Sequence, residues 1–197
     1  MVGGAREIPM SLKLHTIITS TRPGRVGPQL GTWFNDVANA HGGFTSELVD
    51  LASFNLPVFD EPNHPRMAKY EKEHTKAWSA SVKAADAFVF VTPEYNYGVS
   101  PALYNALTFL AQEWAYKPAG FVAYGGVSGG LRAVQQIKPT LTTLKVMPIP
   151  QAVAVPGFGS WLGPDAKFTP NDLMATSAKE VLDELVKWAT ALKPLRG

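Results

Sequence analysis

The chain has 197 residues, 46% of them apolar and 17% charged, which is enough apolar material for one domain with a full core. Its 18 basic and 16 acidic residues leave a net charge of +2, so the composition gives no strong argument for a nucleic-acid partner. The absence of cysteine excludes disulfides, iron–sulfur clusters, thiolate zinc sites and a cysteine nucleophile.

Residues 1–10 are polar and glycine-containing, and we expect them to form a flexible tail ahead of a single domain over residues 11–197. This start has no apolar run of signal-peptide length. No stretch of the chain approaches the roughly 18 apolar residues that cross a bilayer. We therefore expect a cytoplasmic protein with no membrane partner.

In chain order, the first half alternates short apolar runs with helical patterns. A strand is expected at residues 12–18, followed by a loop rich in glycine and proline. A helix is expected at 28–41, because its apolar residues recur at helical spacing and Pro28 suits the first turn. A second strand is expected at 45–51 and a surface helix at 67–85.

The second half continues the alternation. The run at 87–92 is almost wholly apolar, which is typical of a parallel strand covered on both faces. The further elements expected are a helix at 101–114 capped by Ser100, a strand at 119–124, a helix at 131–144 that Pro139 bends or splits, a strand at 151–155 and a last helix that starts at a capping box over 169–172.

Five strands separated by helices imply right-handed crossovers, and hence a single-domain α/β sandwich of three layers with a five-stranded parallel sheet. Ligands of such folds bind outside the carboxyl ends of the strands. The informative residues are therefore those that follow the first, third and fourth strands. No role is assigned to residues 156–197.

The loop after the first strand reads Thr-Ser-Thr-Arg-Pro-Gly-Arg-Val-Gly-Pro over residues 19–28. Its hydroxyls, its two arginines and the following helix N-terminus favour an anion. No acidic residue occurs between Glu7 and Asp36. The loop lacks the endings of the triphosphate and dinucleotide motifs, so a monophosphate ester fits best. The alternative is a capped turn with solvated arginines.

The loop after the third strand, residues 92–101, contains Tyr95, Asn96 and Tyr97 between prolines and a glycine. Two aromatic rings and exposed backbone amides could form the wall of a site for a planar ring. The alternative is a loop whose aromatic rings pack on the rim of the sheet.

The loop after the fourth strand reads Tyr-Gly-Gly-Val-Ser-Gly-Gly over residues 124–130, and its glycines allow backbone to approach a ligand closely. It also matches G-x-S-x-G, the nucleophile elbow of α/β-hydrolases. Those enzymes place the histidine after the serine, whereas all four histidines here precede Ser128, so a triad in that order cannot be built. The acid-free stretch from 114 to 164 makes Arg132 the best candidate for a further anion contact.

Metal binding is not expected. His64 and His74 stand ten residues apart without zinc-site spacing, and we expect both on the surface.

Three segments together resemble the NAD(P)H-dependent FMN reductases of the flavodoxin-like superfamily, which includes quinone, azo-dye and chromate reductases. The resemblance extends from about Lys13 to Val155, and its most specific part is Pro-Glu-Tyr-Asn at 93–96. The matching segments are Ser20-Thr21-Arg22 with Arg25-Val26-Gly27, then Pro93-Glu94-Tyr95-Asn96 with Ser100-Pro101 and Asn105-Ala106-Leu107, and finally Gly125 with Gly129-Gly130-Leu131-Arg132-Ala133.

The resemblance implies a flavodoxin-like fold with strand order 2-1-3-4-5, FMN as cofactor, NADPH or NADH as hydride donor, and a homodimer or homotetramer that uses the helix from Pro101. It implies that the FMN phosphate is held by Ser20, Arg22, Arg25, Val26 and Gly27, and the isoalloxazine by Pro93, Glu94, Tyr95 and Asn96 with Tyr97 beside it. Tyr124, Gly125 and Gly126 would contact the other edge of the ring, and Gly129, Gly130 and Arg132 would bind the nicotinamide nucleotide.

The implied reaction is a ping-pong hydride transfer through flavin N5 to a quinone, an azo compound, free flavin or a metal oxyanion. Because the cofactor carries the chemistry, no catalytic side chain is required. The alternatives are a non-enzymatic electron carrier of flavodoxin type, which would usually be strongly acidic, and an FMN-binding module without turnover. The acid-free stretches lean towards NADPH.

Overall fold

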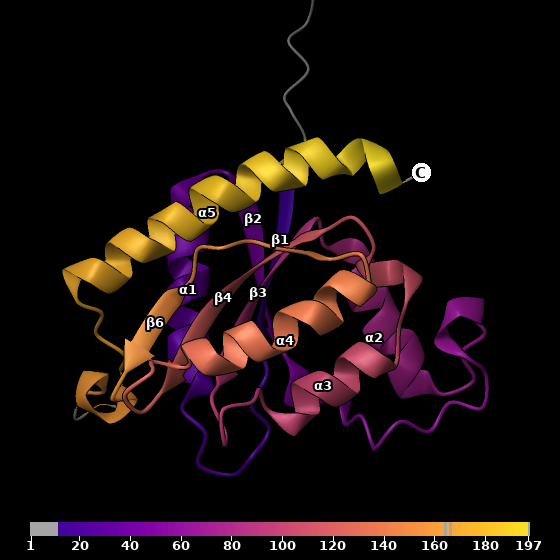
Figure 1. Ribbon diagram of the computed structural model, residues 1–197, viewed down its shortest axis with the longest axis horizontal. Coiled ribbons are helices and arrows are strands. Elements are labelled where there is room, and N and C mark those ends of the chain that lie inside the picture. The colour runs from indigo at the N-terminus through magenta and orange to yellow at the C-terminus, as the bar shows by residue number, and fades with distance from the viewer. Residues whose placement is uncertain (1–11, 164, 166, 197) are drawn as a thin grey trace, which may run out of the picture.

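The computed structural model describes residues 12–163, 165 and 167–196, so the tail expected at 1–10 lies outside the described residues. The sheet is parallel and ordered β2-β1-β3-β4-β5, with β6 also paired to β4, which confirms the predicted order (Figure 1). Its strands are β1 (Leu12–Ile18), β2 (Phe44–Asp50), β3 (Ala87–Pro93), β4 (Pro118–Gly125), β5 (Met147–Pro148) and β6 (Val153–Pro156).

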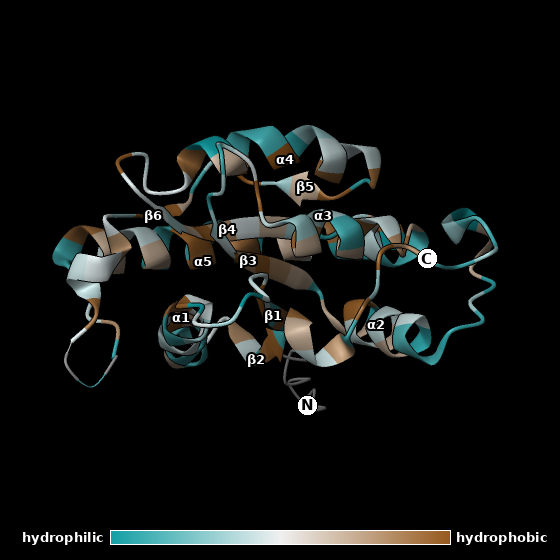
Figure 2. Cartoon of the chain, turned by 90° about the horizontal axis from the view of Figure 1, so that it is seen from below, coloured by the Kyte–Doolittle hydropathy of each residue, from teal (hydrophilic) through white to brown (hydrophobic). Residues whose placement is uncertain are grey.

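Helices cover both faces of this sheet, as predicted. They are α1 (Gly27–His41), α2 (Glu73–Ala84), α3 (Pro101–Thr108), α4 (Leu131–Thr143) and α5 (Asp172–Leu192). Helices α1 and α5 bury their apolar stripes in one core, while α2, α3 and α4 pack into the other. Figure 2 shows hydrophobic strands enclosed by helices whose outer sides are largely hydrophilic. None of the helices in the described ranges combines the length and apolarity needed to cross a membrane.

Strand β3 forms the centre of the structure. All seven of its residues are buried, as its apolar run predicted, because helices cover both faces of a parallel sheet. It pairs with β1 on one side and β4 on the other. The carboxyl ends of β1, β3 and β4 consequently lie side by side, and the three loops of interest start from one edge.

The helix predicted at residues 67–85 begins later, at Glu73. Ala68 has a left-handed backbone, with φ of 51°, which a continuous right-handed helix cannot include. The buried Glu61 carboxylate then accepts the backbone N–H of Lys72 at 3.0 Å and fixes the residue that precedes the helix.

Two further boundaries differ from the prediction. The helix predicted at 101–114 ends at Thr108, and a separate 3-10 turn, η3 (Gln112–Trp114), follows because Ala111 leaves the helical region with φ of −135°. Helix α4, in contrast, runs through Pro139 as one element.

The strand predicted at 151–155 corresponds to β6, which begins at Val153, and a short strand that was not predicted, β5, precedes it at Met147–Pro148. After β5, the N–H of Ile149 still donates to the Ala119 carbonyl of β4, at 2.9 Å. Pro150 has no N–H to donate, so the ladder to β4 is interrupted there and resumes at Val153.

Candidate functional site

The first loop, residues 19–26, starts from a rigid base. The backbone N–H and the hydroxyl of Thr19 both donate to Val91 of β3, each at 3.1 Å. Ser100, the N-cap of α3, donates its hydroxyl to the Thr19 carbonyl at 2.8 Å. The start of the loop is therefore tied to the neighbouring strand and to the start of α3.

Arg25 closes the same loop. Its guanidinium donates to the Ser20 carbonyl at 2.6 Å and to both carboxylate oxygens of Asp50 at 2.7 and 2.6 Å. This is the bidentate geometry that makes arginine–carboxylate pairs strong. The side chain predicted to hold a phosphate is thus engaged in shaping the loop. Asp50 was not among the predicted site residues. It ends β2, the strand next to β1, and ligands of parallel α/β sheets bind outside the carboxyl ends of the strands, so its position could have indicated it.

The first turn of α1 offers its backbone N–H groups to an anion. The N-cap Val26 provides no side-chain hydrogen bond, and no acidic residue occupies the first turn. Unsatisfied N–H groups and the helix dipole give such an end a partial positive charge. A side chain at Gly27 would collide with the Ser20 hydroxyl and lie 3.1 Å from the Tyr124 hydroxyl, so only glycine allows these groups to converge.

Both converging hydroxyls are buried, and within the described part of the chain neither has a hydrogen-bond partner. Burial raises the pKa of Tyr124 to about 12, against a smaller opposing effect of the Ser20 hydroxyl. The side chain of Tyr124 extends into the α1 and α5 side of the sheet, where its ring contacts Phe158 at 5.8 Å between centroids. Its hydroxyl thus lies beside the Ser20 hydroxyl of the first loop, whereas the family resemblance implies that Tyr124 contacts the edge of the isoalloxazine.

The second loop, residues 94–100, contains a two-residue turn. Tyr95 and Gly98 exchange backbone hydrogen bonds of 2.9 Å, and the two residues between them have φ of 50° for Asn96 and 69° for Tyr97. Asparagine tolerates a left-handed backbone, whereas tyrosine rarely adopts it. The strained backbone holds the Tyr97 ring at the surface, 66% exposed.

A contact between two side chains also joins the first and second loops. Arg22, exposed in the first loop, donates from Nε to the Tyr95 hydroxyl at 3.2 Å. Arg22, predicted to bind the FMN phosphate, and Tyr95, predicted to hold the isoalloxazine, are therefore neighbours.

Glu94 connects the second loop to the third loop, residues 126–130. Its carboxylate accepts the Ser128 hydroxyl at 2.7 Å and the backbone N–H of Arg132 at 3.1 Å, and its side chain is only 8% exposed. Burial on its own would raise the pKa of Glu94, but these hydrogen bonds outweigh it and hold the pKa below the usual range. Glu94 is therefore an ionised anchor between the two loops.

Arg132 lies across the same junction. Its guanidinium is 3.4 Å from the Glu94 carboxylate and 4.3 Å from the centre of the Tyr97 ring, and half of its side chain is exposed. Such stacking on an aromatic face is favourable for a cation. Its exposed half leaves a positive group beside the second and third loops.

The glycines of the third loop permit close backbone packing. A side chain on Gly130, whose φ is 86°, would lie 2.6 Å from the backbone nitrogen of Tyr124. One on Gly129, with φ of 59°, would press on Ala154 at 3.1 Å. Around Gly126, in contrast, the space is open. Ser128, the serine of the hydrolase-like motif, donates its hydroxyl to Glu94 at 2.7 Å.

The three loops thus bring the predicted residues together along one edge of the sheet. The first loop and α1 carry Ser20, Arg22, Arg25, Val26 and Gly27; the end of β3 and the second loop carry Pro93, Glu94, Tyr95, Asn96 and Tyr97; the end of β4, the third loop and α4 carry Tyr124, Gly125, Gly126, Gly129, Gly130 and Arg132. Donors for an anion gather at the first loop, and exposed backbone and aromatic surface gather at the other two.

Comparison with known proteins gives a consistent result. The family described as NADPH-dependent FMN reductase matches residues 12–160. An NAD(P)H-dependent FMN reductase of Schizosaccharomyces pombe is 40% identical over 145 residues, 73% of this chain and 72% of that protein. An NADPH azoreductase of a Bacillus species is 35% identical over 136 residues, covering 66% and 74%. The fold resembles FerB, a flavoenzyme NAD(P)H:(acceptor) oxidoreductase from Paracoccus denitrificans, with TM-score 0.72, 20% identity, and coverage of 92% and 98%.

Proposed function

Because the chain belongs to the NADPH-dependent FMN reductase family, we propose that it passes electrons from NAD(P)H through FMN to a second small-molecule acceptor. Membership makes it an oxidoreductase whose cofactors are FMN and a nicotinamide nucleotide. One observation carries the placement of FMN: two buried, unpartnered hydroxyls meet a glycine at the start of α1.

The FMN phosphate fits this point. Ser20 and Tyr124 offer hydroxyls, Gly27 leaves the space, and Arg22 adds an exposed guanidinium. The N–H groups that begin α1 complete the donor set, as at other helix N-termini that bind phosphate. Arg25 serves indirectly, since its pair with Asp50 fixes the loop.

The isoalloxazine would lie between the second and third loops. Open space at Gly126 and the close approach of Gly125 to Glu94, where an added Cβ would be 3.2 Å from the Glu94 Cβ, support a flat group held mainly by main chain. The residues proposed to hold the ring are Pro93, Glu94, Tyr95, Asn96, Gly125 and Gly126, with Tyr97 beside it.

When bound, FMN would supply the hydride chemistry at its N5 atom. The chain's own groups then bind and orient the nucleotides. Gly129 and Gly130 let the backbone approach, and the half-exposed Arg132 guanidinium offers a charge-assisted contact to the diphosphate of NAD(P)H. Glu94 has no proton to give near neutral pH, because its hydrogen bonds keep it ionised.

The acceptor is proposed to be a quinone, an azo compound, free flavin or a metal oxyanion. The names of the relatives favour the first two: besides the azoreductase, a probable NADPH:quinone oxidoreductase of rice is 44% identical over 66 residues, though these are only 32% of either chain. The near-neutral charge of +2 disfavours a flavodoxin-type carrier, which would be strongly acidic.

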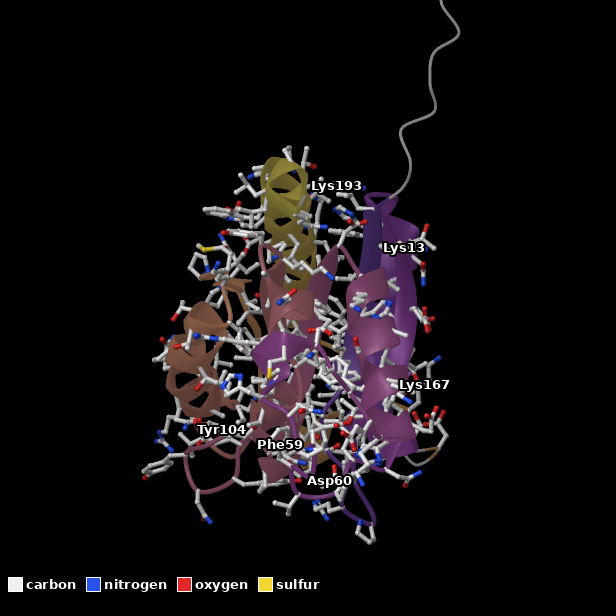
Figure 3. All side chains as sticks on the ribbon, turned by 90° about the vertical axis from the view of Figure 1, so that its right-hand side faces the viewer. Lys13, Phe59, Asp60, Tyr104, Lys167 and Lys193 are labelled. Carbon is white, nitrogen blue, oxygen red and sulfur yellow. The ribbon has the colours of Figure 1, made fainter. Side chains whose placement is uncertain are left out.

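A homodimer or homotetramer is proposed to form through α3. Tyr104 on this helix is 49% exposed and lines, with Phe59, a groove of about 630 Å³ between α3, α4 and the connection after β2. Figure 3 labels both residues in the lower part of the view; the ring of Phe59 packs against the buried Phe109, 5.2 Å away between centroids, and leaves only part of its surface to the groove. An exposed aromatic and apolar groove of this kind is typical of protein interfaces.

The proposed function is tested first by the absorption spectrum of the purified protein. A flavin band that NADPH bleaches under anaerobic conditions is expected. Protein that binds FMN but is never reduced by NADPH would instead be a binding module or a carrier.

Steady-state kinetics test the shared site. With NADPH and a quinone varied together, double-reciprocal plots should give parallel lines, because one nucleotide leaves before the acceptor binds. Intersecting lines would show that both bind at once and would contradict the ping-pong order.

A further inference from the structure

A second cavity, of about 350 Å³, lies between the outer face of α1 and the segment 157–168 that leads from β6 towards α5. From α1 it is lined by Pro28, Thr32, Trp33 and Asp36, and from the other side by Lys167 and Phe168. Pro28, Thr32 and Asp36 stand at i, i+4 and i+8 on one face of the helix, and Trp33 lies beside them with Gln29, which also lines the cavity, four residues before it. The volume lies within the range of small-molecule sites.

The lining combines an aromatic wall with two opposite charges. The rings of Trp33 and Phe168 are 5.0 Å apart between centroids, tilted by 59°, and Phe168 is buried. Asp36 and Lys167 both line the cavity, yet across the described ranges the side chain of neither takes part in an ion pair or hydrogen bond. Figure 3 shows Lys167 at the outer surface. A ligand with an aromatic ring, hydroxyl donors and an anionic group would complement all of them.

The cavity adjoins the proposed FMN site on two sides. Pro28 follows Gly27 directly, at the start of α1. The segment 157–168 begins at the third loop, where the Gly157 N–H donates to the carbonyls of Gly125 and Gly126 at 3.0 and 3.2 Å. The segment then turns back, and the N–H of Thr169 donates to Trp161 at 2.9 Å. A dinucleotide whose nicotinamide lies over the third loop could follow this segment into the cavity.

We propose that this cavity binds the adenosine 2′-phosphate half of NADPH, an inference that rests on the proposed function and adds a specificity site to it. Trp33 and Phe168 contact the adenine, Asp36 accepts from the adenine amino group or a ribose hydroxyl, and Lys167 pairs with the 2′-phosphate. Lys167 and Asp36 act in opposite directions, because the carboxylate repels the 2′-phosphate that the ammonium attracts. Their balance sets the preference for NADPH over NADH.

The test is calorimetric titration of the FMN-loaded protein with 2′,5′-ADP and with 5′-AMP, neither of which can reduce flavin. Lys167→Gln should weaken 2′,5′-ADP at least about fivefold and change 5′-AMP less than about twofold, as loss of a charged contact to phosphate requires. Asp36→Asn keeps an oxygen that can accept the same hydrogen bond and removes the charge that repels the 2′-phosphate, so it should strengthen 2′,5′-ADP. Lys187→Gln, an exposed lysine on α5, is the matched control and should change neither.

The outcomes separate this inference from the function. If 2′,5′-ADP binds the wild type but Lys167→Gln and Asp36→Asn leave its affinity unchanged, the adenosine lies elsewhere and the inference is wrong. The same holds if 2′,5′-ADP does not bind while NADPH still bleaches the flavin. If the flavin is not reduced at all, the proposed function fails whatever the titration gives.

Discussion

Tyr124→Phe removes one buried hydroxyl and keeps the ring that packs against Phe158. A buried polar group without a partner costs about 1–3 kcal/mol, so removing it should stabilise the protein without flavin by about 1 kcal/mol. For a chain of this length that corresponds to a rise in Tm of roughly 2–4 °C. Most substitutions in a core have the opposite sign.

The affinity of the Tyr124→Phe variant for FMN should fall, although its stability without flavin should rise. If the hydroxyl donates to the FMN phosphate, directly or through Ser20, its loss should cost about 1.5–3 kcal/mol, or roughly 10- to 150-fold in Kd. Riboflavin lacks the phosphate and should bind the variant as it binds the wild type. Thermal unfolding measures the first effect, and quenching of flavin fluorescence by the protein measures the second.

Tyr116→Phe, at the opposite edge of the sheet just before β4, is the control and should leave both flavin affinities unchanged. A lower Tm for Tyr124→Phe, with equal losses for FMN and riboflavin, would show that the hydroxyl supports the fold. An unchanged FMN affinity would place the phosphate away from Tyr124.

Three other substitutions have defined outcomes. Arg22→Ala should weaken FMN by about 1.5–3 kcal/mol, and unchanged flavin retention on gel filtration would contradict the site. Glu94→Ala leaves Ser128 and the Arg132 N–H without their acceptor and should lower the unfolding free energy by about 1–3 kcal/mol at pH 7. Because the folded pKa of Glu94 is lowered, this advantage of the wild type should disappear as the pH falls below the usual carboxyl range; a pH-independent difference in urea titrations would argue against it. Burial, more than any other cause, lowers the pKa of Lys117 to about 8 from 10.5, so the wild type should gain stability relative to Lys117→Met as the pH rises from 8 to 10.5, and a loss in that window would refute the assignment.

The parallel sheet and the edge at which its loops gather follow from local patterns, whereas the strand order was implied by the family resemblance. The apolar run over β3 and the alternation of strands with helices predict a sheet covered by helices on both faces. Right-handed crossovers make its strands parallel, so the carboxyl ends of β1, β3 and β4 lie at the same edge. The separate short strand β5 and the late start of α2 could not be predicted in the same way. They depend on Pro150, on the backbone of Ala68 and on a carboxylate from Glu61.

The individual side-chain contacts of the candidate site could not be predicted from the sequence, for a physical reason. Every residue of β4 is buried, so no alternation of polar and apolar residues shows that Tyr124 faces α1. The pair between Arg25 and Asp50 joins residues 25 apart in the chain, and only the register of β1 with β2 brings them together. Residue types at strand ends therefore indicated where the candidate site lies, while the role proposed for each residue depends on the direction of its side chain.

The carboxylate of Glu94 holds the second and third loops together by contacts internal to the protein. The separation of these loops is consequently set during folding, so little conformational entropy remains to be lost when a flat molecule enters between them. With the isoalloxazine between these loops, as proposed, a preorganised gap would select flat molecules by their thickness. Such a gap would suit the proposed reaction, in which two chemically unrelated partners bind in turn at one cofactor.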